Sequence, residues 1–403
     1  MKQPRILTRT ILLVSFVSLF TDIASEMLYP IMPVYLRSIG FSVLLIGILE
    51  GLAEATAGLS KGYFGNLSDA RRSRVPFVRW GYTLSAFSKP MLALSRFPAW
   101  IFLARTLDRF GKGVRTSARD AILSDEAEPR HKGKVFGFHR AMDTVGAAIG
   151  PSLALVFLAF HPGRYRPLFL IAFLPGLVAV SLTLLLRERT SEVPAATAPA
   201  ASAPRRVGLL GYLRYWRQAP AGFRPLVSGL LLFTLFNSSD AFLLLALKNR
   251  GFSDSAMIGF YIFYNLAYAL LSFPIGAIAD RIGLRTTLVI GLLTFAVVYF
   301  FFGFAASTLA FGGLFLLYGV YASATEGISK AIISNLAAKS ETATALGFFN
   351  SLASFFALAA SSLAGLLWFT IGPRAMFMVS GVGVFAVAVY LGLVFRRPEP
   401  RLP

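Results

Sequence analysis

The sequence predicts an all-α membrane protein, with twelve transmembrane helices in two pseudo-symmetric six-helix bundles. Three observations predict this fold class. The chain of 403 residues is 56% hydrophobic and only 14% charged, with a mean hydropathy of +0.67. Apolar segments long enough to cross a bilayer, which takes roughly 20 residues, recur along the whole chain. The second half of the chain also repeats motifs of the first half at a nearly constant offset.

The distribution of charge predicts the topology. A formal net charge of +20 would suggest a nucleic-acid partner in a soluble protein. Here the basic residues instead gather at alternate helix ends, as the cytoplasmic loops of membrane proteins require. These basic segments are residues 2–9, 71–74, 130–134, 187–224, 281–285 and 396–397. We therefore expect a multi-pass protein of a bacterial inner membrane with both termini in the cytoplasm, and no nucleic-acid partner.

The expected elements follow from the apolar segments. The first segment continues past Asp22 and Glu26 to Pro30 and Pro33 without a small-residue cleavage site, so we interpret it as an uncleaved first span. The expected spans are residues 10–36, 43–66, 75–95, 98–119, 134–159, 165–187, 225–247, 256–279, 284–305, 308–333, 342–369 and 374–396. They divide the chain into an N-terminal bundle (1–187), a cytoplasmic linker (188–224) and a C-terminal bundle (225–403).

The linker has two parts. Residues 192–204 are almost only Ala, Pro, Ser and Thr, a composition that cannot bury a core and is typical of a flexible linker. Residues 212–218 are rich in aromatic and Arg side chains, which suit the headgroup boundary of a membrane. We expect a short interfacial helix there.

An internal repeat relates the two bundles. Residues 36–42 match residues 247–253 at an offset of 211, and residues 120–124 match residues 330–334 at an offset of 210. The larger offset also relates Gly65 to Gly276, Asp69 to Asp280 and Arg74 to Arg285. A duplicated six-helix unit follows. Parallel halves of this kind place a transport site at their interface near the middle of the membrane.

Two loops carry a family resemblance. Residues 65–74 read Gly-Asn-Leu-Ser-Asp-Ala-Arg-Arg-Ser-Arg, and residues 276–285 read Gly-Ala-Ile-Ala-Asp-Arg-Ile-Gly-Leu-Arg. Both resemble the loop signature of the major facilitator superfamily, Gly-x-Leu-x-Asp-Arg-x-Gly-Arg. The first departs from it, with Ala70 and Arg72 where Arg and Gly are usual. The Gly allows two helices to approach closely, and the Asp can face a helix N-terminus and an Arg.

The internal repeat covers nearly the whole chain, and the resemblance of its two loops implies a gate. In the family, this cluster latches the cytoplasmic side shut in the outward-open state. The residues expected to form it here are Gly65, Asp69, Arg74, Gly276, Asp280, Arg281 and Arg285.

Further motifs concern the direction of transport. Residues 30–33 resemble a Pro-x-x-Pro element of twelve-span drug exporters. Gly146, Gly150 and Pro151 resemble the antiporter signature Gly-x-x-x-Gly-Pro-x-x-Gly-Gly, although its final Gly pair is replaced by Ala154 and Leu155. The resemblance implies export by antiport. The alternative is ordinary packing of small residues with a Pro kink.

Ionisable residues inside the spans are candidate functional residues, because each costs a few kcal/mol to insert. The N-terminal bundle carries most of them: Asp22, Glu26, Glu50, Glu54, Lys89, Arg105, Asp108, Arg109, His139, Arg140 and Asp143. The C-terminal bundle carries Asp240, Glu326 and Lys330, and it is expected to add Asn237, Tyr261, Asn265, Tyr318 and Asn350 to the cavity. This asymmetry suggests a proton-handling N-terminal half and a mostly neutral C-terminal half.

Depth along the antiparallel spans predicts pairs among these groups. Arg105 could neutralise Glu26 or Glu50, and Arg109 could neutralise Asp22 or Glu54, in two layers about one helical turn, roughly 5.4 Å, apart. Glu326 and Lys330 can pair at i, i+4. Carboxylates outnumber these cations, and both crowding and burial favour the neutral form of a carboxyl group. One of them could therefore carry a coupled proton.

The leading hypothesis is a proton-coupled antiporter, expected to be monomeric, that exports a small organic compound. The alternatives are a proton-coupled uptake symporter, and a divalent-cation transporter with Asp22, Glu26, Glu50 and Glu54 as oxygen ligands. A membrane sensor that transports nothing is disfavoured, because a scaffold gains nothing from buried charge. We expect neither an enzyme nor a bound cofactor, since the sequence contains no nucleophile–base, metal or phosphate-loop motif. It also contains no cysteine, which excludes disulfides and thiolate chemistry.

Overall fold

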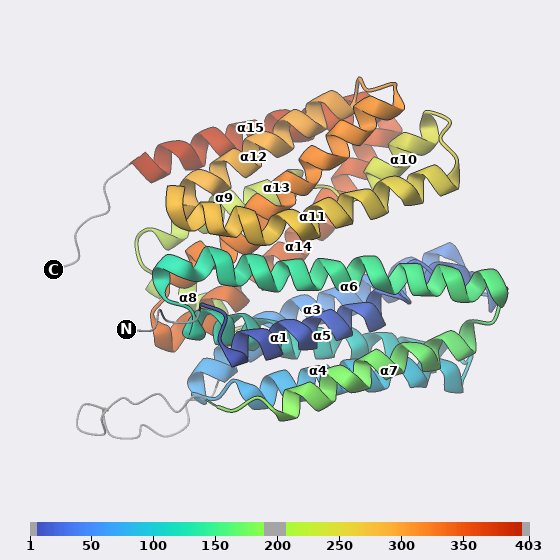
Figure 1. The fold of residues 1–403 in the computed structure, drawn as a ribbon, viewed down its shortest axis with the longest axis horizontal. Helices are drawn as coiled ribbons and strands as arrows, with labels where there is room; N and C mark the ends of the chain where they lie inside the picture. The colour runs from blue at the N-terminus through green and yellow to red at the C-terminus, as the bar shows by residue number, and fades with distance from the viewer. Residues whose placement is uncertain (1–5, 189–206, 397–403) are drawn as a thin grey trace.

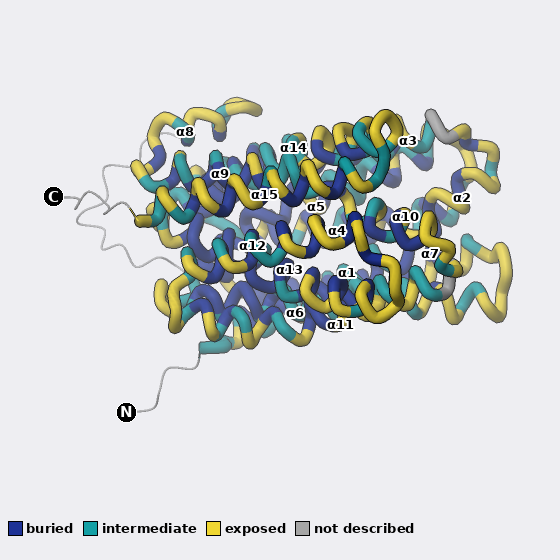
Figure 2. The backbone as a smooth tube through the Cα atoms, turned by 90° about the horizontal axis from the view of Figure 1, so that it is seen from above, coloured by how far each residue is buried: buried dark blue, intermediate teal, exposed yellow. Residues whose placement is uncertain are grey.

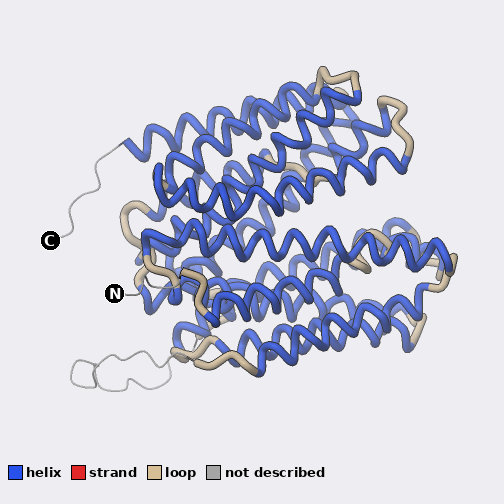
Figure 3. The backbone as a smooth tube through the Cα atoms, in the orientation of Figure 1, coloured by secondary structure: helices blue, strands red, loops and turns tan. Residues whose placement is uncertain are grey.

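A computed structural model describes residues 6–188 and 207–396 of the chain. These residues form helices joined by short loops, and no strand occurs among them (Figure 3). The helices are grouped in two bundles, and the start of α1 (Arg9–Glu26) and the end of α15 (Pro373–Arg396) lie at the same end of the molecule (Figure 1). We call that end the inner end and the opposite end the outer end. The predicted all-α fold of two six-span bundles is confirmed.

The N-terminal bundle contains seven α-helices among the described residues. They are α1 (Arg9–Glu26), α2 (Met32–Ser38), α3 (Val43–Ala70), α4 (Val75–Leu94), α5 (Pro98–Glu126), α6 (Lys132–Phe160) and α7 (Tyr165–Leu184), with a short 3-10 turn, η1 (Pro129–His131), before α6.

The C-terminal part begins with two short elements near the inner end and continues with the second bundle. Its elements are η2 (Gly211–Arg214), α8 (Tyr215–Gln218), α9 (Phe223–Phe236), α10 (Ala241–Asn249), α11 (Asp254–Ile282), α12 (Leu284–Phe302), α13 (Thr308–Leu336), η3 (Lys339–Glu341), α14 (Thr342–Thr370) and α15 (Pro373–Arg396).

The first span of each bundle is broken, which corrects the expectation of continuous helices. The span predicted at 10–36 divides into α1 and α2, with Pro33 in the first turn of α2. The span predicted at 225–247 divides into α9 and α10, with residues 237–240 between them. The two breaks are equivalent under the repeat, which relates Glu26 to Asn237. Irregular backbone at membrane depth is tolerated where it is buried in protein or lines a cavity.

The charge asymmetry predicted between the halves is visible in the helices themselves. Eight helical segments of the described residues are long and apolar enough to cross a membrane by length and composition, and they begin with α6. The remaining passes are α1 with α2, and α3, α4 and α5. These four passes carry the acidic pairs of spans one and two, Lys89 and the charged cluster that begins at Arg105.

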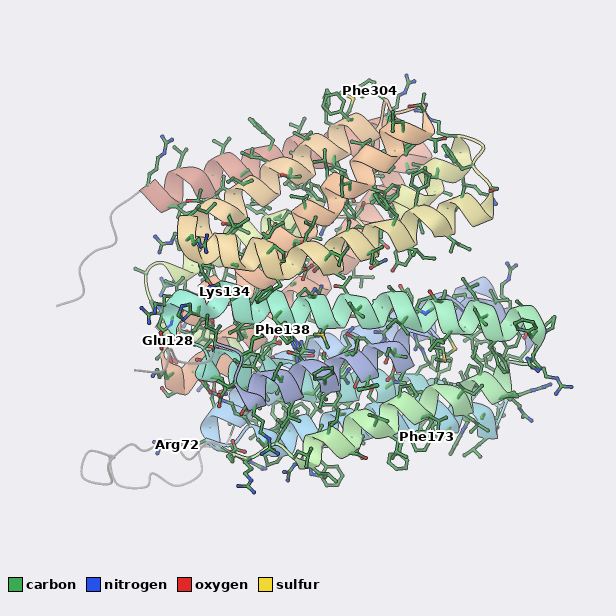
Figure 4. The ribbon with its side chains drawn as sticks, viewed as in Figure 1. Arg72, Glu128, Lys134, Phe138, Phe173 and Phe304 are labelled. Carbon is green, nitrogen blue, oxygen red and sulfur yellow. The ribbon has the colours of Figure 1, made fainter. Side chains whose placement is uncertain are left out.

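The two bundles contact each other mainly through α6 with α11 and α3 with α14, and also through α6 with α13 and α5 with α14. Buried positions concentrate on the inward faces of the helices, and exposed positions follow the periphery (Figure 2). Large apolar side chains such as Leu174 and Leu184 on α7 are exposed there, as a lipid-facing surface requires. Phe173 and Phe304 lie at opposite margins of the molecule (Figure 4).

The expected interfacial segment is more deeply placed than predicted. Residues 212–218 do form short helical elements, but Tyr212 is buried between α3 and α14. Its hydroxyl lies 2.9 Å from Ser351 Oγ, and its ring lies against Gly62. The preceding Ala/Pro-rich stretch, 192–204, lies outside the described residues. The domain boundaries at 187 and 225 stay a prediction.

The topology can be tested directly, because the chain contains no cysteine that would need to be removed first. A cysteine at Gln218, exposed at the inner end, is expected to react with a membrane-impermeant maleimide only after cells are permeabilised. A cysteine at Arg96, exposed in the outer turn between α4 and α5, is expected to react in intact cells. The reverse pattern would show that the termini lie outside the cell.

Candidate functional site

Asp69, near the inner end of α3, caps the N-terminus of α14 in the opposite bundle. Its carboxylate accepts hydrogen bonds from the Thr344 backbone N–H at 2.6 Å and from the Thr344 hydroxyl at 2.7 Å. Arg74 donates to the other oxygen at 2.8 Å. A helix N-terminus presents unpaired N–H groups and partial positive charge, so a carboxylate there is stabilised by roughly 0.3–2 kcal/mol.

Asp280, near the inner end of α11, makes the equivalent contact with α6. It accepts hydrogen bonds from the backbone N–H groups of Gly133 at 2.8 Å and Lys134 at 3.0 Å. We call these two contacts the inner latches. The motif glycines allow the crossings, because a Cβ on Gly65 would collide with the Ala343 backbone and one on Gly276 with the Gly133 backbone.

The other residues of the two motifs make different contacts from one another. Arg74 also donates to Asp125 at 2.8 Å, whereas Arg285 stacks over the Phe395 ring at 5.3 Å and Arg281 is exposed. Arg72, labelled in Figure 4, has a φ of 51°, and the equivalent Gly283 has a φ of 102°. A side chain in this left-handed region costs roughly 1–2 kcal/mol, which explains why Gly is usual at this position.

A layer of ion pairs next to the inner latches also joins the bundles. Asp120 of α5 lies 2.9 Å from Lys330 of α13, and Arg140 of α6 lies 3.1 Å from Glu326 of α13. Arg140 also donates a hydrogen bond to the Tyr268 hydroxyl. The predicted pair between Glu326 and Lys330 is therefore wrong, because each side chain pairs with the opposite bundle.

Arg105 and Glu50 form a close ion pair with several hydrogen bonds in the middle of the N-terminal bundle. Arg105 donates from Nε at 2.9 Å and from Nη2 at 2.6 and 2.8 Å, so both carboxylate oxygens are held. Glu50 is one of the two partners that depth allowed for Arg105, and Glu26 is not held by it. Arg105 is 6% exposed and Glu50 is 32% exposed, so the pair is mostly removed from solvent.

Among the described residues, the guanidinium of Arg109 has no ion pair as close as that of Arg105. Its guanidinium approaches Glu50 at 3.9 Å and Glu54 at 4.0 Å, and its buried Nε has no hydrogen-bond partner among the described residues. Glu54 lies closer to Lys61, at 3.8 Å. The expected pairing of Arg109 with Asp22 is not observed, and the two predicted layers are joined because Arg109 reaches both Glu50 and Glu54.

Two other predicted carboxylates have partners. Asp108 lies 2.6 Å from Lys89 and 3.7 Å from Arg105, and it also accepts a hydrogen bond from Ser85. Asp143 lies 3.6 Å from His139 and 3.7 Å from Arg140 on its own helix.

A charged cleft with an empty volume of about 360 Å³ lies between α1, α4 and α5. It is lined by Asp22, Ser25, Glu26, Tyr29, Ser85, Arg105, Asp108, Arg109, Lys112 and Arg115. Among the described residues, no Lys, Arg or His nitrogen lies within 4.0 Å of the Asp22 or Glu26 carboxylate. These two acids therefore differ from Glu50 and Asp108, which are held in close ion pairs.

Lys112 and Arg115 are cleft residues that the sequence analysis did not single out as site residues. Their spacing could have found them, because steps of three and four residues from Arg105 and Arg109 keep them on one face of a helix. Arg115 is 5% exposed and stacks over the Tyr82 ring at 4.4 Å.

The predicted residues of the C-terminal bundle form a separate group. Asp240 accepts a hydrogen bond from Tyr318 at 2.7 Å, and Asn237 donates to Tyr321 at 3.0 Å. Asp240 and Asn237 both lie at the break between α9 and α10. On α11, Asn265 donates to the Tyr261 carbonyl at 2.9 Å. None of these side chains is among the described residues that line the charged cleft.

The bundles are in close contact near the inner end and separate toward the outer end. A Cβ added at Gly137 or Gly347 would meet backbone of the opposite bundle. A Cβ added at Gly47 or Gly51 on the outer part of α3, or at Gly259 on α11, would meet nothing within 4 Å. Figure 1 shows α6 and α11 diverging toward the outer end. The bundles are therefore closed at the inner end and open at the outer end.

The antiporter-like residues pack α6 against α1. A Cβ on Gly146 would collide with the Leu19 carbonyl, and one on Gly150 would collide with the backbone around Met27. Pro151 follows inside α6. The contact brings α6 directly against the segment of α1 that carries Asp22 and Glu26.

Comparison with known proteins decides the family. The model of the Major Facilitator Superfamily matches residues 14–264 and 252–403. The chain belongs to the major facilitator superfamily. An uncharacterized transporter of Methanocaldococcus jannaschii is 34% identical over 98% of this chain and 96% of its own length. An uncharacterized protein of Mycobacterium tuberculosis is 30% identical over 83% of this chain and 80% of its own length.

Solved structures of this superfamily share the fold. A human organic anion transporter aligns with a TM-score of 0.79 at 20% identity, over 96% of this chain and 100% of its own. The E. coli fucose:proton symporter aligns with a TM-score of 0.77 at 11% identity, over 97% of this chain and 99% of its own. The protein is therefore a multi-pass membrane transporter, and the family's members act on small molecules as secondary transporters.

The inner latches lead to a test of gating. Asp69→Asn should shift this facilitator toward an inward-facing state, because the helix cap loses its charge, worth roughly 0.3–2 kcal/mol. A cysteine at Gly51, which is open to the outer side, should then react more slowly with an external maleimide. Asp280→Asn should act in the same direction but less strongly, because among the described residues only backbone groups donate to it within hydrogen-bond distance.

The matched control is Glu128→Gln, which removes a carboxylate at the same end whose ion pairs within the described part of the chain are with Arg130 and His131 of its own bundle. Labelling of the Gly51 cysteine should not change in this variant. Equal labelling rates in all three variants would mean that the motif is a turn without a gating role.

Proposed function

We propose that this transporter couples the movement of a small organic compound to protons, with Asp22 and Glu26 as the coupling groups. The observation that carries the proposal is the difference between the carboxylates of the N-terminal bundle. Glu50 and Asp108 are fixed by close cations, whereas Asp22 and Glu26 face the charged cleft with no cation within 4.0 Å among the described residues. A carboxylate without a fixed partner can change protonation without leaving a buried cation unpaired.

Alternating access supplies the rest of the cycle. In the outward-facing arrangement, the inner latches and the ion-pair layer close the inner end, so substrate and protons reach the cleft from the outer side. Opening the inner end requires Asp69 and Asp280 to leave α14 and α6. We place the protein in a bacterial inner membrane as a monomer, with both termini in the cytoplasm, and the basic segments at the inner end support this orientation.

Two directions of coupling are supported by different observations. Exchange and export, expected from the antiporter-like motif, are supported by the contact of Gly146 and Gly150 with the α1 segment that carries the coupling acids. Uptake together with protons is supported by Arg109 and Arg115, whose buried donors lack partners among the described residues. Such cations can bind an anionic substrate whose charge a cotransported proton offsets. The divalent-cation alternative has weaker support, because no group of three or more acidic or His side chains among the described residues is arranged to hold a metal ion.

Proton coupling is tested by a compound screen in proteoliposomes loaded with a pH-sensitive dye. A transported compound should move protons across the membrane in wild-type vesicles. Asp22→Asn and Glu26→Gln should keep folded protein and lose this proton movement, because each removes a titrating group without breaking an ion pair.

Glu50→Gln is the contrasting variant. It leaves Arg105 with a neutral partner, at a cost of roughly 3 kcal/mol, the low end for a broken buried pair because Glu50 is about one-third exposed. We therefore expect a lower yield and a lower melting temperature rather than a selective loss of coupling. Wild-type proton movement in both Asp22→Asn and Glu26→Gln would place the coupling group elsewhere, and Asp143 or Asp240 would be tested next.

A further inference from the structure

Helix α5 presents a row of basic side chains to the charged cleft. Arg105, Arg109, Lys112 and Arg115 all line it. Such a row is expensive in the middle of a bilayer, because each cation is removed from water and repels its neighbours. Most buried cations in proteins are therefore matched by carboxylates. In this cleft, the carboxylates of the described residues do not pair with all of the cations.

The close ion pairs account for only part of the charge. Glu50 neutralises Arg105, and Lys89 neutralises Asp108. Three cations of the lining then remain, Arg109, Lys112 and Arg115, against Asp22 and Glu26 of the lining and against Glu54, which lies near both Arg109 and Lys61. If Asp22 and Glu26 are protonated, the one ionised carboxylate left in the lining among the described residues is Asp108, which Lys89 holds.

The three cations also have unused donors. The buried Nε of Arg109 and the buried Nη1 of Arg115 have no hydrogen-bond partner among the described residues. Arg115 is 5% exposed, so water around it is restricted. Lys112 is accessible from the cleft, and no carboxylate of the described residues lies within 4.0 Å of its nitrogen. Leaving a buried guanidinium N–H without an acceptor costs more free energy than leaving a neutral N–H without one. A ligand oxygen that accepts this hydrogen bond would remove that cost.

We propose that Arg109, Lys112 and Arg115 bind the anionic group of the transported compound, a small organic carboxylate or phosphate ester. The inference rests on the proposed transport function and names the substrate class of the same site. Guanidinium groups suit such anions because their planar donors match two oxygens at once.

Every charged group that faces the coupling acids acts on this balance. Asp22 and Glu26 interact with each other, and Asp22 also interacts with Asp143 of α6 and with Lys112 and Arg115 of α5. From α11, Tyr261 interacts with Glu26. A ligand anion bound to Lys112 and Arg115 offsets the attraction of these cations for the ionised Asp22 carboxylate, so an anion and a proton favour each other in this cleft.

The charge of the substrate decides whether it moves with the proton or against it. An anion and a proton that favour each other in one cleft cross the membrane together, whereas a cationic substrate would compete with the proton and be exchanged for it. Of the two directions of coupling, an anionic substrate therefore favours cotransport with protons.

The test is ligand-dependent thermal stabilisation of the full-length protein in lipid nanodiscs. The probes are lactate, succinate, benzoate and glycerol 1-phosphate, each compared with its neutral counterpart lactamide, succinamide, benzamide or glycerol, and with benzylammonium as a cation. At least one anion should raise the melting temperature while its neutral counterpart does not. The shift should be larger at mildly acidic than at neutral pH.

Substitutions of cleft residues test whether the anion that stabilises the protein binds in the cleft. Lys112→Gln should weaken the affinity for the stabilising anion by about tenfold or more, the usual value of a charged hydrogen bond. Lys248→Gln removes the same charge from an exposed position at the end of α10 and should leave the affinity unchanged. Arg115→Lys provides a second variant that keeps the charge and loses the planar donor group, and it should weaken binding less than Lys112→Gln.

The outcomes separate this inference from the proposed proton coupling. If no anion of the set stabilises the protein more than its neutral counterpart, or if benzylammonium does so instead, the anion site is overturned while proton coupling still stands. If an anion binds equally well at both pH values, the anion site is supported and Asp22 and Glu26 are not its coupling partners. Equal affinity in Lys112→Gln and wild-type protein would also overturn the site.

Discussion

The two bundles are held together by carboxylates that cap helices of the opposite bundle. Asp69 and Asp280 satisfy N–H groups at the starts of α14 and α6, where no intrahelical acceptor is available. Close contact between α3 and α14, and between α6 and α11, is possible at this end because Gly65 and Gly276 have no side chain. The ion-pair layer of Asp120 with Lys330 and of Arg140 with Glu326 joins the bundles next to these caps. In the proposed cycle, the closed inner end and access to the charged cleft from the outer end depend on both.

The charges of the N-terminal bundle divide into two kinds. Glu50 with Arg105 and Asp108 with Lys89 are close pairs that fix α3, α4 and α5 relative to one another. Asp22 and Glu26 on one side of the cleft, and Arg109, Lys112 and Arg115 on the other, keep unused capacity for protons and ligand oxygens. Breaking a buried pair is costly, whereas changing the charge of an unpaired group in a cleft is cheaper. This division gives the bundle a rigid frame around a group of side chains that can titrate.

Much of this arrangement could be predicted from sequence because it repeats or follows a local pattern. The motif around Asp69 and Asp280 indicated both inner latches, and counting depth along the spans gave Glu50 as a partner for Arg105. Depth alone does not determine how a helix is rotated about its axis, so it could not show that Arg109 reaches Glu50 and not Asp22. The Asp120–Lys330 pair was missed although the repeat aligned these two positions, because residues related by the repeat can meet across the pseudo-symmetry axis. Tyr212 looked interfacial from composition, and its burial between α3 and α14 depends on Gly62 and Ser351, which are distant in sequence.

The most direct test of the account is the distance between the bundles at both ends, measured by electron spin resonance on pairs of spin-labelled cysteines. The inner pair is Arg71→Cys with Ser340→Cys, and the outer pair is Gly47→Cys with Leu366→Cys, all at exposed or open positions. In the Asp69→Asn, Asp280→Asn double variant, the inner distance should lengthen and the outer distance should shorten, because the capped helix ends are released. Distances that match those of the wild-type bundles at both ends would contradict the claim that these caps hold the transporter outward-facing.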